Sequence, residues 1–480
     1  MIVAKAALLL WPIAGMVLSA VRGRELGIIW TVCVGYLFLP SSLSMDLPGL
    51  PPYGKDEAIA LAVMLGLLVK QKQPSPDPPG RVPPAFAVLI VLLVFSIAFT
   101  WLTNTDSFTE FGRFRAGLTI SDLRSGIFGL LATLVPLYAG MRYLTRVRHA
   151  EQLSCAIMIL ALIYAMMALV EMRLSPQLHT WVYGYFPSSF AQHFRGGYRP
   201  VGFLNHGLAL GIFLALAAIV VAGRIRKGIG DRMISIGALV VIYGVLLISK
   251  NFGAFLIATV ILPIVLFLPK TLQFRAAAAL TLAFLAFPLL RGAGLVPLDA
   301  FVDWVASIDA DRAASFETRL KNEEAFIERH ARRPVFGWGG WGRARPVAES
   351  GADLTLADGA WVLRLVQYGW FGFLTYYGAM TFAVLALWWR SARTGLDPLL
   401  VAFALMLAGN YINLLPNSNF SPISWLVCGM LIANVFSTAK GEQPTSPVET
   451  DTVADRSGPV YTRFPKGPPR SPRQQIRTRE

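Results

Sequence analysis

Charged residues are scarce in this chain of 480 residues, of which they make up 15%, whereas a soluble globular protein holds about 25%. Hydrophobic residues make up 55% of the chain, and the mean hydropathy is +0.55. This balance argues against a soluble globular fold. The apolar runs are continuous and do not alternate with polar residues, which argues against a transmembrane β-barrel as well.

Cysteine and histidine are also few. The three cysteines, Cys33, Cys155 and Cys428, lie inside apolar runs and have no spacing typical of a disulfide framework or a metal site. The five histidines are scattered and form no zinc-binding motif. We therefore expect neither a metal ion nor a cofactor.

What the chain does have is a series of apolar runs of about 17–22 residues, each long enough to cross roughly 30 Å of hydrocarbon. They predict an all-α, polytopic transmembrane helical bundle of about 13 spans, with a range of about 11 to 14. The predicted spans are 2–20, 26–42, 56–69, 84–102, 122–141, 153–171, 201–222, 233–249, 252–269, 276–291, 360–389, 398–415 and 421–438. The first run precedes Arg22 and Arg24, whereas a signal peptide has its basic residues before the apolar core, so we expect a retained helix.

These runs divide the chain into four parts. Residues 1–291 hold the first ten predicted helices, and residues 292–359 form a long extracytoplasmic loop. Residues 360–438 hold the last three helices. Residues 439–480 are rich in Pro, Ser, Thr and Arg, and such a segment cannot bury enough apolar surface to fold. We expect this basic tail to be disordered, either solvated or in contact with anionic lipid.

The distribution of basic residues predicts the topology. The net charge is +15 and the pI is near 9.9, and the basic residues gather in alternate short connections, which by the positive-inside rule stay in the cytoplasm. The opposite connections are then extracytoplasmic, and the C-terminus is cytoplasmic. The predicted outer connections are 43–55, 103–121, 172–200, 250–251, 292–359 and 416–420. The acidic partners that this pattern favours are membrane lipid headgroups or phosphate, and not nucleic acid.

Some basic residues stand on the predicted outer side, against this rule. Arg199 and Lys250 lie at the mouths of spans, where a cation is costly unless it is paired or functional. Arg319 and Arg343 belong to the long loop, whose other arginines are equally explained as a solvated helix face. Several cations at this interface would bind a pyrophosphate, because guanidinium grips phosphate bidentately and Lys acts as a point charge.

The long loop carries further candidates. Trp338 and Trp341 belong to a Gly-Trp cluster at 337–342, and their rings offer flat faces for a sugar, or serve as interfacial anchors. Asp358 stands a few residues before the next span. Its carboxylate is a candidate general base for an acceptor hydroxyl, and equally a candidate helix N-cap.

The stretch from Arg199 to Gly369 resembles the O-antigen ligase and polymerase superfamily of bacterial envelope glycosyltransferases. Three pieces carry the resemblance: RPVGFLNHGLALG at 199–211, SKNFGAF at 249–255, and Arg319 followed by RPVFGWG at 333–339, Asp358 and Gly369. Lys250 stands where the family often has Arg, Asp358-Gly359 stands where it has His-Asn, and Arg333 stands where His is usual.

The resemblance implies a metal-independent glycosyltransferase of O-antigen or exopolysaccharide biosynthesis. A polyprenyl-pyrophosphate-linked glycan would be held by Arg199, Lys250 and Arg319, with Asp358 near the hydroxyl of a glycan or lipid acceptor. Two alternatives stay open. A transporter or flippase of the same glycans should place ionisable groups near the midplane of its spans. An acyltransferase should have a His-centred site, and His206 and His330 lack an acid at a telling spacing.

Overall fold

The computed structural model describes residues 1–46, 51–71, 77–188, 192–194, 196–347, 359–390, 397–418 and 420–437. Asp358, the side chain of Trp341 and the tail predicted at 439–480 lie outside the described residues.

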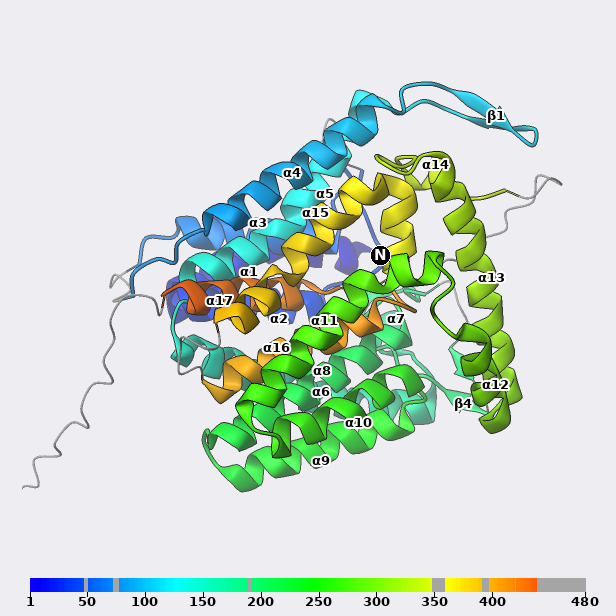
Figure 1. Ribbon diagram of the computed structural model, residues 1–480. Helices are drawn as coiled ribbons and strands as arrows, with labels where there is room; N and C mark the ends of the chain where they lie inside the picture. The colour runs from blue at the N-terminus through cyan, green and yellow to red at the C-terminus, as the bar shows by residue number, and fades with distance from the viewer. Residues whose placement is uncertain are drawn as a thin grey trace, which may run out of the picture. The chain divides into compact units, whose positions relative to one another are not determined.

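Each of the predicted apolar runs overlaps a helix (Figure 1). These helices are α1 (Ile2–Arg22), α2 (Arg24–Phe38), α3 (Lys55–Leu68), α4 (Pro84–Leu102), α5 (Ile120–Tyr143), α6 (Val147–Leu174), α8 (Gly207–Lys227), α9 (Arg232–Ile248), α10 (Phe252–Phe267), α11 (Lys270–Gly292), α15 (Ala360–Arg390), α16 (Pro398–Asn413) and α17 (Pro422–Ser437). Side-chain caps fix some of the starts. Asp231 accepts from Met233 N at the start of α9, for example, at 2.7 Å.

The all-α class is therefore confirmed, and the chain has the apolar helices of a multi-pass membrane protein. Among the described residues, seven helices are long and apolar enough to cross a membrane, namely α1, α4, α5, α6, α8, α11 and α15. Four more, α9, α10, α16 and α17, are apolar but shorter. The count of about 13 spans stays a prediction.

The predicted long loop is largely helical. It contains α12 (Leu298–Ile308), α13 (Ala310–Arg332) and the single turn α14 (Trp341–Ala344). The helix α13 packs against α15 and buries Phe326 completely. Three small elements complete the connections: α7 (Leu178–Tyr183), the antiparallel hairpin β1 (Phe108–Glu110) with β2 (Arg113–Arg115), and the hairpin β3 (His193–Phe194) with β4 (Gly197–Tyr198).

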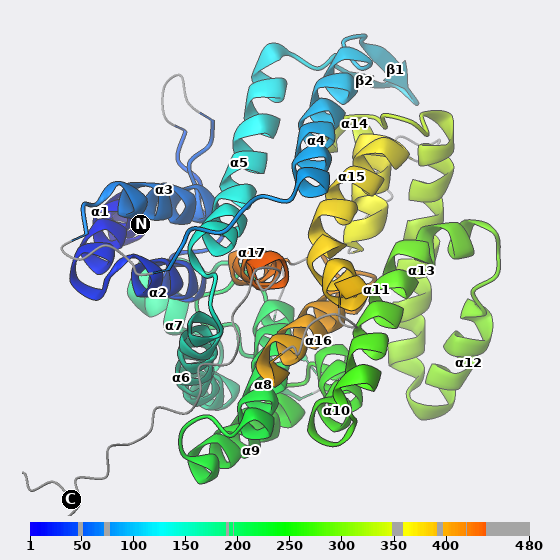
Figure 2. The same cartoon turned by 60° about the vertical axis from the view of Figure 1, so that its left-hand side comes forward.

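Helices α8 and α16 form the centre of the bundle, with α6, α10 and α11 packed around them (Figure 2). Nearly every side chain of α8 from Gly207 to Arg224 is buried, as is most of α16. Both helices are apolar on all sides, which is the pattern of a helix surrounded by other helices.

The connections between helices fall into two sets. In the hydrogen bonds and ion pairs given below, each connection contacts another connection of its own set or an adjoining helix end. We call the first set the loop face, which among the described residues comprises 39–46, 51–54, 103–119, 175–188, 192–194, 196–206, 249–251, 293–347, 359, 414–418 and 420–421. Its members are joined by Ser41 Oγ to Phe203 O at 2.7 Å, Asn104 Nδ2 to Gly337 O at 3.0 Å, and Ala360 N to Leu414 O at 3.1 Å. This face gathers where Figure 1 labels β1, α14, α13, α12 and β4.

We call the second set the basic face, which among the described residues comprises 69–71, 77–83, 144–146, 228–231, 268–269 and 397, with the adjoining helix ends. Its contacts are likewise internal. Gly80 N donates to Arg142 O at 2.8 Å, and Lys227 pairs with Asp397 at 2.6 Å. The alternation of basic and less basic connections in the sequence thus corresponds to two opposite ends of the helices.

Candidate functional site

The helix α15 is broken at Gly369, whose φ of 64° and ψ of −170° are not helical. The 334–339 segment of the loop face lies against this break and satisfies the backbone groups that it frees. The four hydrogen bonds are Trp338 N to Val366 O (2.9 Å), Gly339 N to Gln367 O (2.8 Å), Trp370 N to Pro334 O (2.8 Å) and Phe371 N to Val335 O (3.1 Å). The RPVFGWG motif and Gly369, which the resemblance pairs, are therefore in direct contact.

Two glycines permit this close approach of backbones. A Cβ on Gly369 would lie 2.2 Å from Val335 O, and a Cβ on Gly337 would lie 2.5 Å from the carbonyl of Gln367. Both residues also have a positive φ that L side chains rarely adopt. The glycines of the cluster thus shape the loop around α15, which is a structural role.

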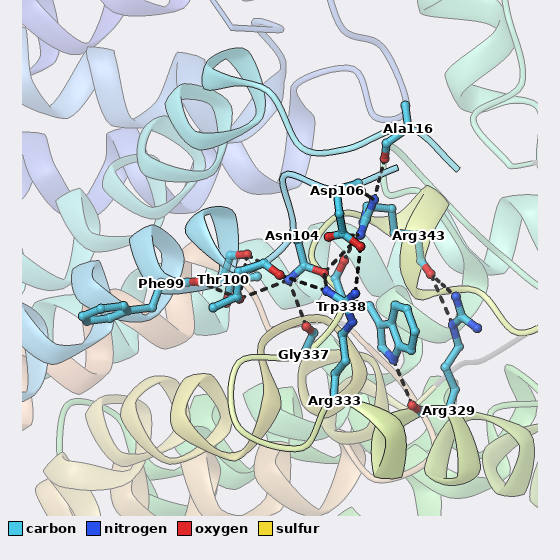
Figure 3. Close-up of polar contacts among 11 residues, drawn as sticks. Phe99, Thr100, Asn104, Asp106, Ala116, Arg329, Arg333, Gly337, Trp338 and Arg343 are labelled. Carbon is cyan, nitrogen blue, oxygen red and sulfur yellow. Dashed lines mark hydrogen bonds and ion pairs between the residues drawn. The ribbon is translucent and has the colours of Figure 1, made fainter. Parts of the chain in front are cut away.

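Arg343 anchors the same loop to the connection between α4 and α5 (Figure 3). Arg343 is 4% exposed, and its guanidinium donates hydrogen bonds to five oxygen atoms of neighbouring residues. The acceptors are Trp338 O (3.3 Å), Asp106 O (2.7 Å), Ala116 O (2.7 Å), Asn104 Oδ1 (3.3 Å) and Asp106 Oδ1 (3.4 Å). We predicted a substrate-binding role for Arg343, but this arrangement uses its guanidinium to hold the loop.

Trp338 is also part of this packing. Its side chain is 7% exposed, and its Nε1 donates to Arg329 O at 2.8 Å. The guanidinium carbons of Arg329 and Arg333 lie 4.1 Å and 4.6 Å from the ring centroid, and the ring of Phe108 lies 5.4 Å away. The indole is thus packed among these neighbours, and its predicted role in sugar stacking stays a prediction. Trp341 received the same prediction, and its side chain lies outside the described residues.

Charge pairs strengthen the contact between the two connections. Arg329 pairs with Glu110 at 2.7 Å, and both side chains are largely buried. Arg333 donates to Asp106 at 3.0 Å. This hydrogen bond, together with the charges of Arg333 and Arg343, holds the pKa of the Asp106 carboxyl below its usual value.

Arg199 and Lys250, predicted from sequence-distant turns, lie together on the loop face. Arg199 Nη2 donates to the carbonyl of Lys250 at 3.3 Å. The stem of Arg199 lies over Gly207, where a Cβ would be 2.4 Å from its Cγ. Lys250 has a φ of 60°, an unusual conformation for a residue with a side chain. The turn between α9 and α10 is therefore fixed beside the segment that leads into α8.

Arg319 lies at another part of the loop face, near the start of α15. It belongs to α13, and its Nη1 donates to the carbonyl oxygen of Pro416 at 3.4 Å. Gly359, the residue that follows Asp358 in the sequence, sits close to Leu415 O, and Ala360 N donates to the carbonyls of Leu414 and Asn417. Asp358 itself lies outside the described residues, so its predicted catalytic role stays a prediction.

Two groups of charged residues were missed by the sequence reasoning. Arg364 of α15 lies over the rings of Tyr368 and Tyr376, at 4.8 Å and 3.8 Å from their centroids. In the sequence, Arg364 could have been noticed as a single Arg within an apolar run. Lys55 and the acids after it line a cavity on the loop face. Their signal was three consecutive charged residues directly before an apolar run.

No protein-family model matches the chain, and no curated protein matches it. Among the described residues, no three His, Cys, Asp or Glu side chains are grouped so as to hold a metal ion. The resemblance to the O-antigen ligase superfamily therefore rests on the residues quoted above and enters the functional argument as a proposal.

Proposed function

We propose that the protein is a membrane glycosyltransferase of the bacterial inner membrane, with its loop face extracytoplasmic and its C-terminus cytoplasmic. It would transfer a glycan from a polyprenyl-pyrophosphate donor to a glycan or lipid acceptor, as an O-antigen or exopolysaccharide polymerase or ligase does. The observation that carries the proposal is the contact between Arg199 and Lys250. Arg199 donates to the main-chain carbonyl of Lys250, so two basic residues that the sequence separates widely lie next to each other at one end of the helices, where a membrane-embedded pyrophosphate would lie.

The chemistry fits such a donor. The oxygen of the acceptor hydroxyl would form a bond to the anomeric carbon, while the bond from that carbon to the pyrophosphate oxygen breaks. Negative charge then grows on the pyrophosphate, and fixed cations in a site of low dielectric stabilise it. The hydroxyl proton would pass to a carboxylate, for which Asp358 is the candidate. Arg319 lies close to the start of α15, the helix that follows Asp358 in the sequence, and would supply a third cation to the site.

A glycan transporter is the second candidate, and one observation favours it. Arg364 is a cation within the apolar helix α15, which is broken a few residues later at Gly369. Ionisable residues inside spans and discontinuous helices are features of transporters. The four backbone hydrogen bonds that close the break make it a rigid structural joint, and this favours the transferase.

The test uses the full chain in nanodiscs with a polyprenyl-pyrophosphate-linked oligosaccharide, without metal or nucleotide. We expect free polyprenyl pyrophosphate together with a longer or transferred glycan. A ladder of donor-linked products would identify a polymerase, and release only with a separate acceptor would identify a ligase. If the donor stays intact in nanodiscs but crosses between leaflets in proteoliposomes, the transferase is excluded and the transporter is correct.

A further inference from the structure

A polar cavity of about 390 Å³ opens on the loop face between α2, the start of α3 and the 199–206 segment. This volume falls within the range of about 300–1,000 Å³ that small-molecule sites occupy. Its polar lining includes Tyr36, Ser41, Lys55, Asp56, Glu57 and Asn205. None of these residues is among the site residues predicted from the sequence.

Lys55 is held in a fixed position at this cavity. Its Nζ donates to Ser41 Oγ at 2.9 Å and to Phe203 O at 3.3 Å, and it lies 5.4 Å from the ring centroid of Tyr36. Burial lowers the pKa of Lys55 to about 7, an effect that the charge of Asp56 partly offsets. Lys55 is the first residue of α3 and directly precedes the predicted span 56–69.

Two carboxylates stand beside this ammonium group. Glu57 accepts a hydrogen bond from Gly54 N at 3.0 Å through one oxygen, Oε2, which orients its carboxylate. Asp56 is exposed at the mouth of the cavity. The lining therefore offers acceptors from two acids, donors from an ammonium group, and both kinds of group from the amide of Asn205 and the serine hydroxyls.

We propose that this cavity binds a sugar unit through its hydroxyl groups. Each sugar hydroxyl both donates and accepts, so a lining that mixes carboxylates, an amide, an ammonium group and hydroxyls matches it better than it matches a pyrophosphate, which only accepts. The two carboxylates would repel a pyrophosphate.

The cavity is connected to the predicted donor site through one short segment. Phe203 O accepts hydrogen bonds from both Ser41 and Lys55, and Phe203 lies only four residues after Arg199. The same segment is fixed by Glu171, whose Oε2 accepts from Val201 N and Gly202 N, each at 2.7 Å. If the proposed transferase function holds, on which this step rests, the cavity is the subsite for the acceptor sugar.

The test measures protection of Lys55 from acetylation in the full-length protein in nanodiscs. Acetic anhydride is applied at about pH 7.5, where a lysine with a lowered pKa reacts readily, and labelling is quantified by mass spectrometry. The probes are the methyl glycosides of glucose, galactose, mannose, rhamnose and N-acetylglucosamine, with inorganic pyrophosphate as a separate probe. Lys321, which is exposed on α13, is the control lysine.

We expect at least one glycoside to lower the labelling rate of Lys55 by about fivefold or more while Lys321 stays unchanged. Glu57→Gln and Asn205→Ala should each weaken this protection by about tenfold, the effect of one lost hydrogen bond to a ligand. Protection by none of the glycosides, or by pyrophosphate alone, would overturn the proposal. Unchanged protection in both variants would overturn it as well.

The variant Arg199→Ala separates this proposal from the proposed function. Arg199 does not line the cavity, so the variant should retain glycoside protection of Lys55 while it loses glycan transfer. If glycosides protect Lys55 but the wild-type protein transfers no glycan, the sugar site stands and the transferase proposal fails.

Discussion

At the scale of single residues, the loop face uses arginines in two different ways. Arg343 is buried and directs its guanidinium at carbonyl and carboxylate oxygens of the neighbouring connection. Arg199 and Lys250 are only partly buried, and the guanidinium of Arg199 donates to the main-chain carbonyl of Lys250. Burial therefore separates the cation that holds the structure from the two that are candidates for binding phosphate.

Replacement of Arg343 should destabilise the protein. In Arg343→Ala the carbonyl oxygens of Asp106 and Ala116 lose the donors of two part-buried hydrogen bonds, and a hydrogen bond to a charged group contributes about 1.5–3 kcal/mol. We expect a loss of about 3 kcal/mol in the free energy of unfolding, measured as a lower melting temperature in detergent. The control is Arg113→Ala on the exposed β2 strand, which should leave the melting temperature unchanged. Equal melting temperatures for wild type and Arg343→Ala would contradict this account.

Asp106 should make the stability depend on pH. Since Arg333 and Arg343 lower its pKa in the folded state, its contribution is fully present above the unfolded value, about 3.9. It is lost as the pH falls through the lower folded value. The side chain is 51% exposed, so solvent screening keeps the effect small. Melting temperatures measured between about pH 6 and about pH 3 should fall less steeply in Asp106→Asn. Parallel curves would rule out this contribution.

At the scale of elements, the most informative feature is the broken helix α15 and the 334–339 segment that closes its break. The apolar run of α15 was visible in the sequence, because such runs are long and continuous. Its break was not, since an isolated Gly within an apolar run is tolerated in many helices. What fixes the break is a backbone contact with a segment about thirty residues earlier, and sequence patterns do not report such contacts.

The glycine of the break gives a sharp test. Gly369→Ala adds a Cβ 2.2 Å from Val335 O at a backbone conformation that only glycine adopts readily, and we expect a loss of at least about 2 kcal/mol. Gly378→Ala in the same helix is the matched control. Its Cβ would be 3.5 Å from Leu89, an ordinary contact, so we expect unchanged or slightly higher stability. Similar melting temperatures for the two variants would show that the break is not required.

Contacts between segments that are distant in the sequence also decide which other features could be predicted. The meeting of Arg199 with Lys250 could be predicted, because both residues stand at mouths of spans on the same side. The burial of Trp338 and Arg343 could not, because it depends on the connection that contains Asn104 and Asp106. The described part of the predicted loop at 292–359 contains the helices α12, α13 and α14, which are too short or too polar to be predicted as membrane spans.

At the scale of the whole bundle, the connections form two faces. Contacts such as Ser41 with Phe203 on the loop face, and Lys227 with Asp397 on the basic face, join alternate connections of the chain. This is the arrangement that a helical bundle has when successive helices run in opposite directions. Among the short connections the basic residues concentrate at one end, and this charge asymmetry predicts which end lies in the cytoplasm.

Cysteine labelling tests the two faces and their orientation. In a variant without its three natural cysteines, single exposed positions would be Arg113→Cys and Leu295→Cys on the loop face, and Arg232→Cys and Arg275→Cys on the basic face. A membrane-impermeant maleimide should label the first pair in spheroplasts and the second pair only in inverted vesicles. Labelling of the pairs from the reverse sides would keep the two faces and contradict the orientation. Labelling of one position from each pair on the same side would contradict the faces themselves.

The central claim is that Arg199 and Lys250 hold the pyrophosphate of a lipid-linked glycan donor. The most direct measurement compares glycan transfer by the wild type, Arg199→Ala, Lys250→Gly and the basic-face control Arg232→Ala in nanodiscs. Lys250→Gly suits the positive φ of this position, so it removes the charge without destabilising the turn. The account predicts at least about a hundredfold loss of transfer in the first two variants, as charge-stabilising groups contribute, with normal melting temperatures and an unaffected control. Transfer by Arg199→Ala and Lys250→Gly at the wild-type rate would contradict it.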